Sequence, residues 1–306
     1  MIVVLFGVTI LLFAVLKLTP GDPARVMAGL GATPEVIEAI RSRLGLDQAL
    51  HVQYWRLFSG IFNGDLHAAT YNKGVWTVIS ERLPATIELG VVALTLALLV
   101  SIPSGILAAV YRNTPIDHGV TALSIAGVSI PVFWFAMMLM ILFGVKLRVL
   151  PVSGRGDLVG AWSFLTIDGL RHLIIPAIAL GAQQMAMNAR LVRSNMLEIL
   201  EQEYVKVARS KGLREWQVIL RHAFPNALAP LLTNVGLQIG ALLAGAVVTE
   251  TVTAWPGIGR LMMQSILRRD QAVVFGLAVF IAGVYMISNL IIDLLYVYVD
   301  PRITYD

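Results

Sequence analysis

Acidic and basic side chains are concentrated in one short segment of an otherwise apolar chain. Residues 198–225 hold nine of them, six of which fall within residues 206–221: Lys206, Arg209, Lys211, Arg214, Glu215 and Arg221. An ionised side chain at the centre of a bilayer costs roughly 2.5–3.5 kcal/mol, so burying the segment in lipid would cost more than about 20 kcal/mol. The segment must lie outside the hydrocarbon, where its charges can orient a partner through ion pairs.

Four uncharged polar residues lie within apolar runs and form two pairs. Gln184 and Asn188 are four residues apart, as are Asn234 and Gln238, so each pair shares one face of a helix. Polar groups in membrane helices face the protein interior or a water-filled cavity, which makes these residues candidates to line a path for a polar substrate. Hydrogen bonding between helices, worth about 0.6 kcal/mol per contact, explains them as well.

The residue types that catalyse reactions or bind metals are not assembled into a motif. The sequence has no cysteine, and its five histidines are scattered at positions 51, 67, 118, 172 and 222. No cluster therefore has the spacing of a metal site. The phosphate-binding pattern G-x-x-x-x-G-K-[ST] and the hydrolase patterns H-E-x-x-H and G-x-S-x-G are also absent. We expect a non-catalytic chain that binds no ATP through such a loop.

The composition is that of a membrane protein. Hydrophobic residues make up 57% of the chain and charged residues 14%, against about 25% charged residues in typical soluble domains. The first apolar run lacks the basic leader and the clear cleavage site of a signal peptide, which favours an uncleaved span. We predict an all-α integral membrane protein with six transmembrane helices, near residues 2–18, 86–110, 120–145, 173–195, 227–251 and 273–298.

A segment of ordinary soluble character separates the first two spans. Thr33 and Pro34 are typical of a helix start, Gly45 is typical of a helix end, and residues 51–62 form a second amphipathic stretch. The sequence therefore divides into a first transmembrane helix at 1–19, an external helical insertion at 20–84 and a five-helix core at 85–306. The charged loop at 196–225 falls between the fourth and fifth spans.

The positive charges indicate an orientation for this topology. An even number of spans puts both termini on one side, together with 190–225, which has seven Lys and Arg residues, and with 111–118, which has one. The opposite short loops, 146–172 and 253–272, have four and three. Basic residues are enriched in cytoplasmic loops, so we predict that both termini are cytoplasmic and that residues 20–84 are external.

The charged segment has the pattern of two short helices joined by a bend. The first helix runs through Tyr204, Val205 and Ala208 and ends near Gly212, which adopts a left-handed conformation at little cost. The second carries Trp216, Ile219 and Leu220, and we expect Pro225 to end it. Apolar side chains at this density beside charges favour a docking surface, although a plain basic loop that only orients the chain is the alternative.

This bend resembles the cytoplasmic loop of binding-protein-dependent ABC importers. That loop has the pattern E-A-A, three residues, Gly, nine residues, Ile, any residue, Leu-Pro. Ala208, Gly212 and Pro225 match the second Ala, the Gly and the Pro at unchanged spacing, whereas other positions differ. The form found here, VARSKGL…ILRHAFPNALAP, resembles that of the dipeptide/oligopeptide/nickel permeases. Five further segments also resemble that family: TPGDPA (19–24), LPATIEL (83–89), SIPVFW (129–134), TETVTAWPGIGR (249–260) and NLIIDLLYVYVDPRI (289–303).

The resemblance implies a set of partners. A second, similar permease would complete the translocation pathway, two cytoplasmic ATPases would supply ATP and Mg²⁺ chemistry, and an extracytoplasmic solute-binding protein would deliver the substrate. The membrane would be a bacterial or archaeal cytoplasmic (inner) membrane, and no nucleic acid is expected. The cytoplasmic loop would be the coupling helix that contacts an ATPase, through Tyr204, Val205, Ala208, Arg209, Lys211, Gly212, Leu213 and Arg214.

Two questions stay open at this stage. Small peptides are the implied substrate, but the same architecture would serve nickel chelates or glutathione-like solutes. A self-sufficient secondary transporter is the alternative class, although the two halves of the chain show no clear repeat.

The external insertion also carries a candidate interface. Aromatic residues are favoured in interface cores, so we expect Trp55, Phe58 or Phe62 to meet the solute-binding protein. Packing of these residues within the insertion itself is the alternative.

Overall fold

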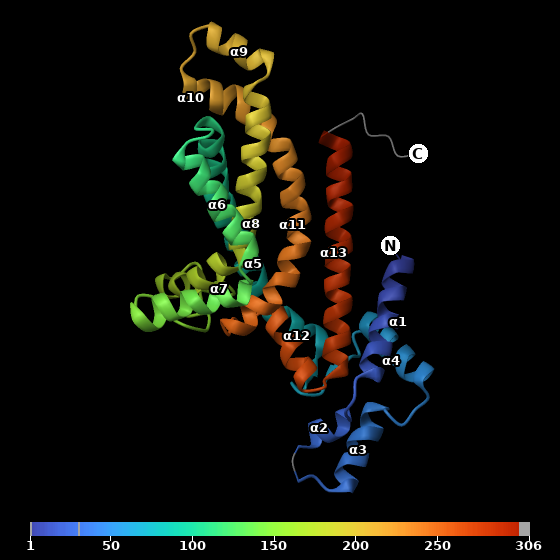
Figure 1. The fold of residues 1–306 in the computed structure, drawn as a ribbon. Helices are drawn as coiled ribbons and strands as arrows, with labels where there is room; N and C mark the ends of the chain where they lie inside the picture. The colour runs from blue at the N-terminus through green and yellow to red at the C-terminus, as the bar shows by residue number, and fades with distance from the viewer. Residues whose placement is uncertain (1, 30, 300–306) are drawn as a thin grey trace. The chain divides into compact units, whose positions relative to one another are not determined.

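The computed structural model describes residues 2–29 and 31–299, with the backbone alone at residues 2, 229, 239, 241–245 and 291–299. The described chain is mainly helical (Figure 1). Its elements in order are α1 (Ile2–Leu18), α2 (Pro23–Ala28), α3 (Pro34–Leu44), α4 (Leu50–Asn63), β1 (His67–Ala68), β2 (Lys73–Gly74), α5 (Val75–Val110), α6 (Pro115–Ser129), α7 (Val132–Leu139), the π-helical η1 (Met140–Lys146), α8 (Ile167–Leu200), α9 (Glu203–Ser210), α10 (Glu215–Gln217), the π-helical η2 (Val218–Ala223), α11 (Phe224–Val252), α12 (Ile258–Leu267) and α13 (Gln271–Val299). The short antiparallel pair of β1 and β2 departs from the all-α prediction.

The chain forms two compact units. The first contains Met1–Thr86 and Pro256–Ile287, and the second contains Ile87–Trp255 and Ser288–Asp306. Residues 256–287, which the sequence assigned to the permease core, thus pack with the N-terminal residues. Helix α12 within this stretch was not predicted.

The core of the first unit joins segments that are far apart in the sequence. Ile79 of α5, Leu261 of α12 and Phe275 of α13 are buried in one cluster. The side chain of Asp270 accepts a hydrogen bond from the backbone N–H of Thr70 at 2.9 Å, which ties the β1–β2 turn to the start of α13. Both residues belong to the first unit, so this unit fixes the β1–β2 turn through its own contacts.

The helix boundaries predicted within the insertion are confirmed. Helix α3 starts at Pro34 after an extended Thr33 and ends at Gly45, whose φ of 68° is left-handed. The backbone N–H of Gly45 then donates to a carbonyl at the end of α3, as in a glycine C-cap. Helix α4 covers the predicted amphipathic stretch 51–62.

In the second unit, α8 is the central helix and packs against α6, α7 and α11. It also lies close to α5, because a Cβ added at Gly105 of α5 would lie 2.7 Å from the carbonyl oxygen of Ala189. A Cβ added at Gly181 of α8 would lie equally close to the carbonyl oxygen of Ala93, at 2.7 Å. Glycine at both sites lets the two backbones approach, as is common between membrane helices.

The prediction of one continuous helix at 120–145 is wrong. The structure has α6 and the α7–η1 helix instead, bent by 107° at Ile130 and Pro131. A residue that precedes proline is disfavoured in the α conformation, and Ile130 is accordingly extended, with φ −83° and ψ 125°. Proline at 131 therefore breaks the apolar run that hydropathy alone joins.

The prediction that Pro225 ends a helix is also wrong. The chain continues from α10 through η2 into α11, and Pro225 lies in the first turn of α11. A proline inside an α-helix clashes with the carbonyl four residues earlier, which here is that of Arg221. The wider π-helical turn of η2 covers Arg221 and relieves that clash, so the helix tolerates the proline.

Length and composition identify fewer membrane helices than the sequence predicted. Among the described residues, α5 and Gln271–Leu290 of α13 are long and apolar enough to cross a membrane, and the bent α6–α7–η1 pair adds a third candidate. Helix α1 is shorter, and α5 begins eleven residues before the predicted 86. The count of six spans stays a prediction.

Candidate functional site

The charged loop folds into the predicted bend. Helix α9 leaves the end of α8 after a turn at Glu201 and Gln202, and Gly212 separates α9 from α10 with a left-handed φ of 77°. A Cβ added at Gly212 would have no heavy atom within 4 Å, so the space beside it is open. The backbone alone requires glycine here, because other residues adopt this conformation at a cost. We call residues 203–223 the elbow.

The inner face of the elbow packs on the chain's own helices. Val205 and Ala208 of α9 are buried with Val218 of η2 against Val192 and Met196 of α8. Ala208 was predicted to lie at the contact with an ATPase, and within this chain its side chain is buried; the ATPase contact itself stays a prediction. The small side chain allows α9 to lie close to the helices below it, and Val205 fixes it there.

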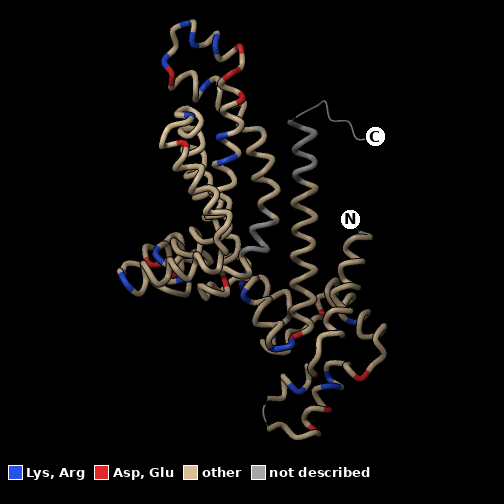
Figure 2. The backbone as a smooth tube through the Cα atoms, viewed as in Figure 1, with Lys and Arg blue, Asp and Glu red and all other residues tan. Residues whose placement is uncertain are grey.

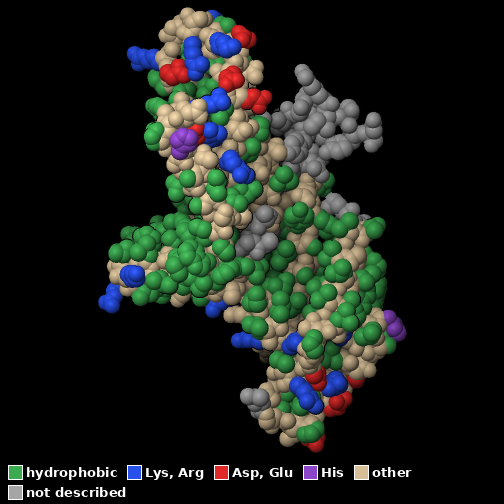
Figure 3. Space-filling view, viewed as in Figure 1, with side chains coloured by type: hydrophobic (Ala, Val, Ile, Leu, Met, Phe, Trp, Pro, Cys, Tyr) green, Lys and Arg blue, Asp and Glu red, His purple; other side chains and the backbone are tan. Residues whose placement is uncertain are grey.

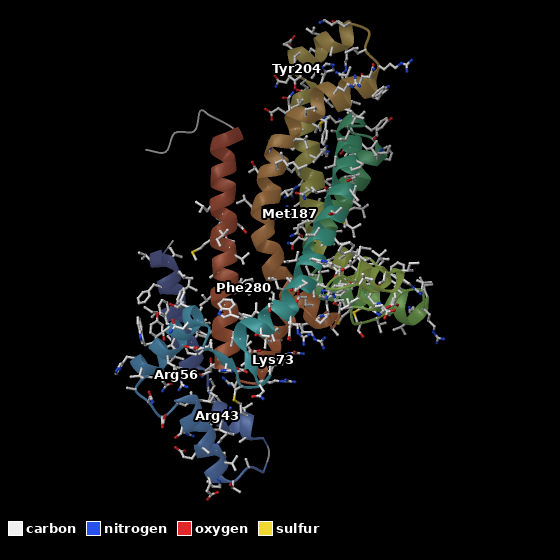
Figure 4. The ribbon with its side chains drawn as sticks, turned by 180° about the vertical axis from the view of Figure 1, so that it is seen from behind. Arg43, Arg56, Lys73, Met187, Tyr204 and Phe280 are labelled. Carbon is white, nitrogen blue, oxygen red and sulfur yellow. The ribbon has the colours of Figure 1, made fainter. Side chains whose placement is uncertain are left out.

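The outer face of the elbow carries exposed apolar groups. Tyr204, Leu213 and Trp216 are exposed, and Trp216 retains 51% of its accessible surface. Tyr204 lies near the tip of this region in Figure 4, and its hydroxyl accepts a hydrogen bond from Asn226 at 2.8 Å. Exposed apolar groups on a segment that must lie in water form a surface suited to a protein partner.

Lys and Arg residues, with Asp and Glu among them, are spread along the elbow (Figure 2). Arg209 forms an ion pair with Glu215 across the bend, at 2.7 Å, and this hydrogen-bonded pair raises the pKa of Arg209 above its ordinary value. Lys211 and Arg214 are exposed. Of the predicted coupling residues, Arg209 thus stabilises the bend, whereas Lys211 and Arg214 face solvent.

An ion pair that the sequence analysis missed lies below the elbow. The guanidinium of Arg193 on α8 donates two hydrogen bonds to Asp117 near the start of α6, at 2.5 and 2.8 Å. Asp117 also accepts the backbone N–H of Asn113 at 3.0 Å. The pair ties the loop before α6 to the helix that carries the elbow. An arginine within a predicted span was the available signal, because such a charge requires a partner.

Three of the four predicted pathway residues bond to one another. Asn188 on α8 accepts from Asn234 and Gln238 on α11, both at 2.9 Å, and donates back to Gln238 at 3.2 Å. Asn188 is fully buried within this chain. These contacts hold α8 against α11. They correspond to the second interpretation of these residues, which was hydrogen bonding between helices, and not to the lining of a pathway. Gln184 is also buried, and its Oε1 has no hydrogen-bond partner within the described residues.

A second missed residue, Glu88 of α5, anchors the segment between η1 and α8. Its fully buried carboxylate accepts two hydrogen bonds from Arg155, at 2.5 and 3.0 Å. It also accepts from the backbone N–H and hydroxyl of Ser163 and from the N–H of Phe164. Arg155 in turn lies over the ring of Trp255, 5.7 Å from its centroid. The available signal was a glutamate within the apolar run LPATIEL. This segment was named above only because it resembles the permease family, and Glu88 was given no role.

The aromatic residues of the insertion pack on α1. Phe58 of α4 contacts Phe6 edge to face, with ring centroids 5.8 Å apart, and lies beside both Trp55 and Phe62. Trp55 and Phe62 keep 61% and 64% of their accessible surface. The structure thus brings the three candidates together on one helix, with Phe58 turned inward and the other two exposed.

Comparisons with known proteins cover nearly the whole length of the chain. Residues 101–305 match the family described as "Binding-protein-dependent transport system inner membrane component", and residues 1–90 match the N-terminal family of the same membrane components. Two families thus account for nearly all of the sequence.

Individual relatives are similar along almost the entire chain. A probable D,D-dipeptide transport system permease protein of Escherichia coli (strain K12) is 42% identical over 99% of this chain and 94% of its own. The dipeptide transport system permease protein of the same strain is 41% identical over 97% and 94%. A di/tripeptide transport system permease protein of Pseudomonas aeruginosa is 42% identical over 97% and 94%.

One solved structure has a similar fold. A chain of the MetNI methionine ABC transporter, in an inward-facing conformation, aligns with a TM-score of 0.54 at 16% identity. The alignment covers 71% of this chain and 96% of that chain. At this identity the likeness concerns the fold alone.

Proposed function

The chain belongs to the family of inner membrane components of binding-protein-dependent transport systems, and from this premise we propose that it forms half of a translocation pathway for small peptides. It is a permease subunit of an ABC importer. Relatives at 41–42% identity over nearly the whole chain are named as permeases for dipeptides, D,D-dipeptides and di/tripeptides. That agreement among near full-length relatives is the observation that carries the proposal for peptides.

The elbow is the proposed coupling element. Its buried inner face makes α9 move with α8, because Val205 and Ala208 pack directly on that helix. Its outer face presents the exposed side chains of Tyr204, Leu213 and Trp216, and the space beside Gly212 is open. A cytoplasmic ATPase that contacts the outer face would transmit its motion into the helices of the pathway. ATP and Mg²⁺ would be held by two such ATPase subunits, and this chain would catalyse no reaction.

The remaining partners follow from the same premise. A second, similar permease would complete the pathway, and an extracytoplasmic solute-binding protein would deliver the peptide. The permease would cross the inner membrane six times, with both termini and the elbow in the cytoplasm and residues 20–84 outside.

Transport by the assembled importer in vesicles tests the coupling role. We expect Gly212→Val to abolish ATP-dependent dipeptide uptake while the protein still inserts, because a side chain would obstruct the ATPase and strain the backbone. Gly64→Val is the matched control, since Gly64 has the same φ of 77° and equally open space but lies outside the elbow. Equal losses in the two variants would remove the coupling role from Gly212.

The substrate class has a separate test. Binding measurements on the solute-binding protein that works with this permease should show affinity for di- and tripeptides. Affinity for nickel chelates or glutathione, with none for dipeptides, would replace the peptide while the permease role stands.

A further inference from the structure

Helix α4 lies antiparallel to the apolar helix α1. Gln53 accepts a hydrogen bond from Lys17 near the end of α1, and the Tyr54 hydroxyl is 2.9 Å from the Thr9 hydroxyl. Phe58 then contacts Phe6, near the start of α1. As the chain advances along α4, its partners on α1 thus move away from the polar end of that helix.

Polar side chains at the end of α1 and the start of α13 form a layer. Distances along the two helices can be measured from it. Lys17 also donates to Gln271, the first residue of α13, at 3.3 Å, so the end of α1 and the start of α13 lie at one level. Phe6 is eleven residues from Lys17, which is about 16 Å along a helix that rises 1.5 Å per residue. The stretch of α1 between them is almost wholly apolar.

Contacts that lead to α13 also place α4 far from the polar layer. The indole N–H of Trp76 donates to the carbonyl of Ile61 in α4, and the Trp76 ring packs on Phe280. Phe280 is nine residues beyond Gln271, or about 14 Å, in a helix apolar enough to cross a membrane. Through Trp76, the second half of α4 therefore lies level with an apolar part of α13, well beyond the polar layer.

The chain returns to the polar layer after α4. Gly64 ends the helix in a left-handed conformation, Leu66 and Ala68 are buried on the return path, and the N–H of Thr70 reaches Asp270, next to Gln271. Residues 53–70 thus enter and leave on the same side. Backbone that is not helical is tolerated at membrane depth where protein covers it.

The charged residue of α4 is directed away from this depth. The guanidinium of Arg56 lies against Gly45, in the polar turn after α3. The aliphatic stem of an arginine can lie along apolar surface while its charge reaches water. Trp55 and Phe62 stay exposed, and hydrophobic side chains gather over the part of the first unit that α1 and α4 form (Figure 3).

We propose that α4 is a re-entrant helix embedded in one leaflet of the membrane, with Trp55 and Phe62 in contact with lipid acyl chains. The two exposed rings continue the lipid-facing surface of α1 at the same depth, where water is absent. This placement removes them from the surface that a water-soluble binding protein would meet. Lipid, and not that protein, is the partner of this face.

Spin labels can test the environment of each position, because oxygen concentrates in hydrocarbon and a nickel–ethylenediaminediacetate complex stays in water. The chain has no cysteine, so single labels at Phe62→Cys and Trp55→Cys report without background. The assembled importer is reconstituted in phosphatidylethanolamine–phosphatidylglycerol vesicles. We expect the ratio of oxygen to nickel accessibility to exceed one at position 62. Glu35→Cys, on the exposed face of α3, is the control and should give a ratio below one.

Two results would overturn the proposal. Greater accessibility to nickel than to oxygen at both 55 and 62 would place these residues in water, where a binding protein could reach them. Exclusion of both reagents, compared with the control at 35, would show that another protein surface covers α4.

Discussion

At the scale of single residues, buried charges are the features with the largest expected effects. Glu88 accepts hydrogen bonds from Arg155, Ser163 and Phe164, and both the Arg155 side chain and Ser163 are largely buried. Loss of one member of a buried pair leaves an uncompensated charge. Such residues hold a loop in one position more firmly than exposed ion pairs do.

We predict that Glu88→Gln lowers the free energy of unfolding by about 3–5 kcal/mol, since it leaves the Arg155 guanidinium buried without a carboxylate. Thermal unfolding of the purified permease in detergent measures the change. Glu81→Gln is the matched control on the same helix: Glu81 pairs with Lys73 at 2.6 Å, but both side chains are about half exposed, so its effect should be at most about 1 kcal/mol. Similar destabilisation by the two variants would contradict a special role for Glu88.

At the scale of elements, the elbow has two faces with different roles. Val205, Ala208 and Val218 fix α9 and η2 to α8, whereas Tyr204, Leu213 and Trp216 are available to a partner. Helical periodicity explains this division, because residues three or four apart share a face. One short segment can therefore be rigidly attached on one side and recognised on the other.

Substitutions on the two faces should have separable consequences. We predict that Trp216→Ala leaves the thermal stability of the permease nearly unchanged but lowers ATPase co-purification several-fold, because aromatic anchors dominate interfaces. Val205→Ala should instead destabilise the permease, since it removes buried methyl groups. A Trp216→Ala variant that retains normal ATPase binding and substrate-stimulated hydrolysis would show that the outer face is only a solvated loop surface.

At the scale of the whole molecule, orientation rests on the distribution of basic residues. The elbow region has the highest count of Lys and Arg among the short loops, and the enrichment of basic residues in cytoplasmic loops predicts that it faces the cytoplasm. The exposed helix α3 then lies on the other side of the membrane, if the chain crosses six times.

Single-cysteine labelling can check this orientation without removing any native cysteine. In intact cells, a membrane-impermeant maleimide should label Glu35→Cys on α3 and should not reach Lys211→Cys in the elbow until the membrane is opened. Both positions are exposed, so a difference in labelling cannot be caused by a difference in burial. Labelling of position 211 in intact cells would show that the elbow is external and that the predicted topology is inverted.

The sequence by itself determined which segments are helical and apolar and where several of them end. Periodicity and punctuation placed α3 between Thr33 and Gly45 and the bend at Gly212, because these depend on local backbone preferences. The resemblance of short motifs identified the family. Local rules failed in two places. Hydropathy joined residues 120–145 into one helix, which Pro131 breaks, and the rule that proline ends a helix failed at Pro225, where a π-helical turn lets the helix continue.

Only the tertiary structure decided which polar and aromatic groups meet. Asn188, Asn234 and Gln238 come from two helices about fifty residues apart and form one amide cluster. Glu88 and Arg155 are joined across 67 residues. The level of α4 is defined by its contact with α1 and, through Trp76 of α5, by α13. Sequence spacing fixes neighbours along one helix, but a partner on another helix depends on how the helices pack, which no single segment encodes.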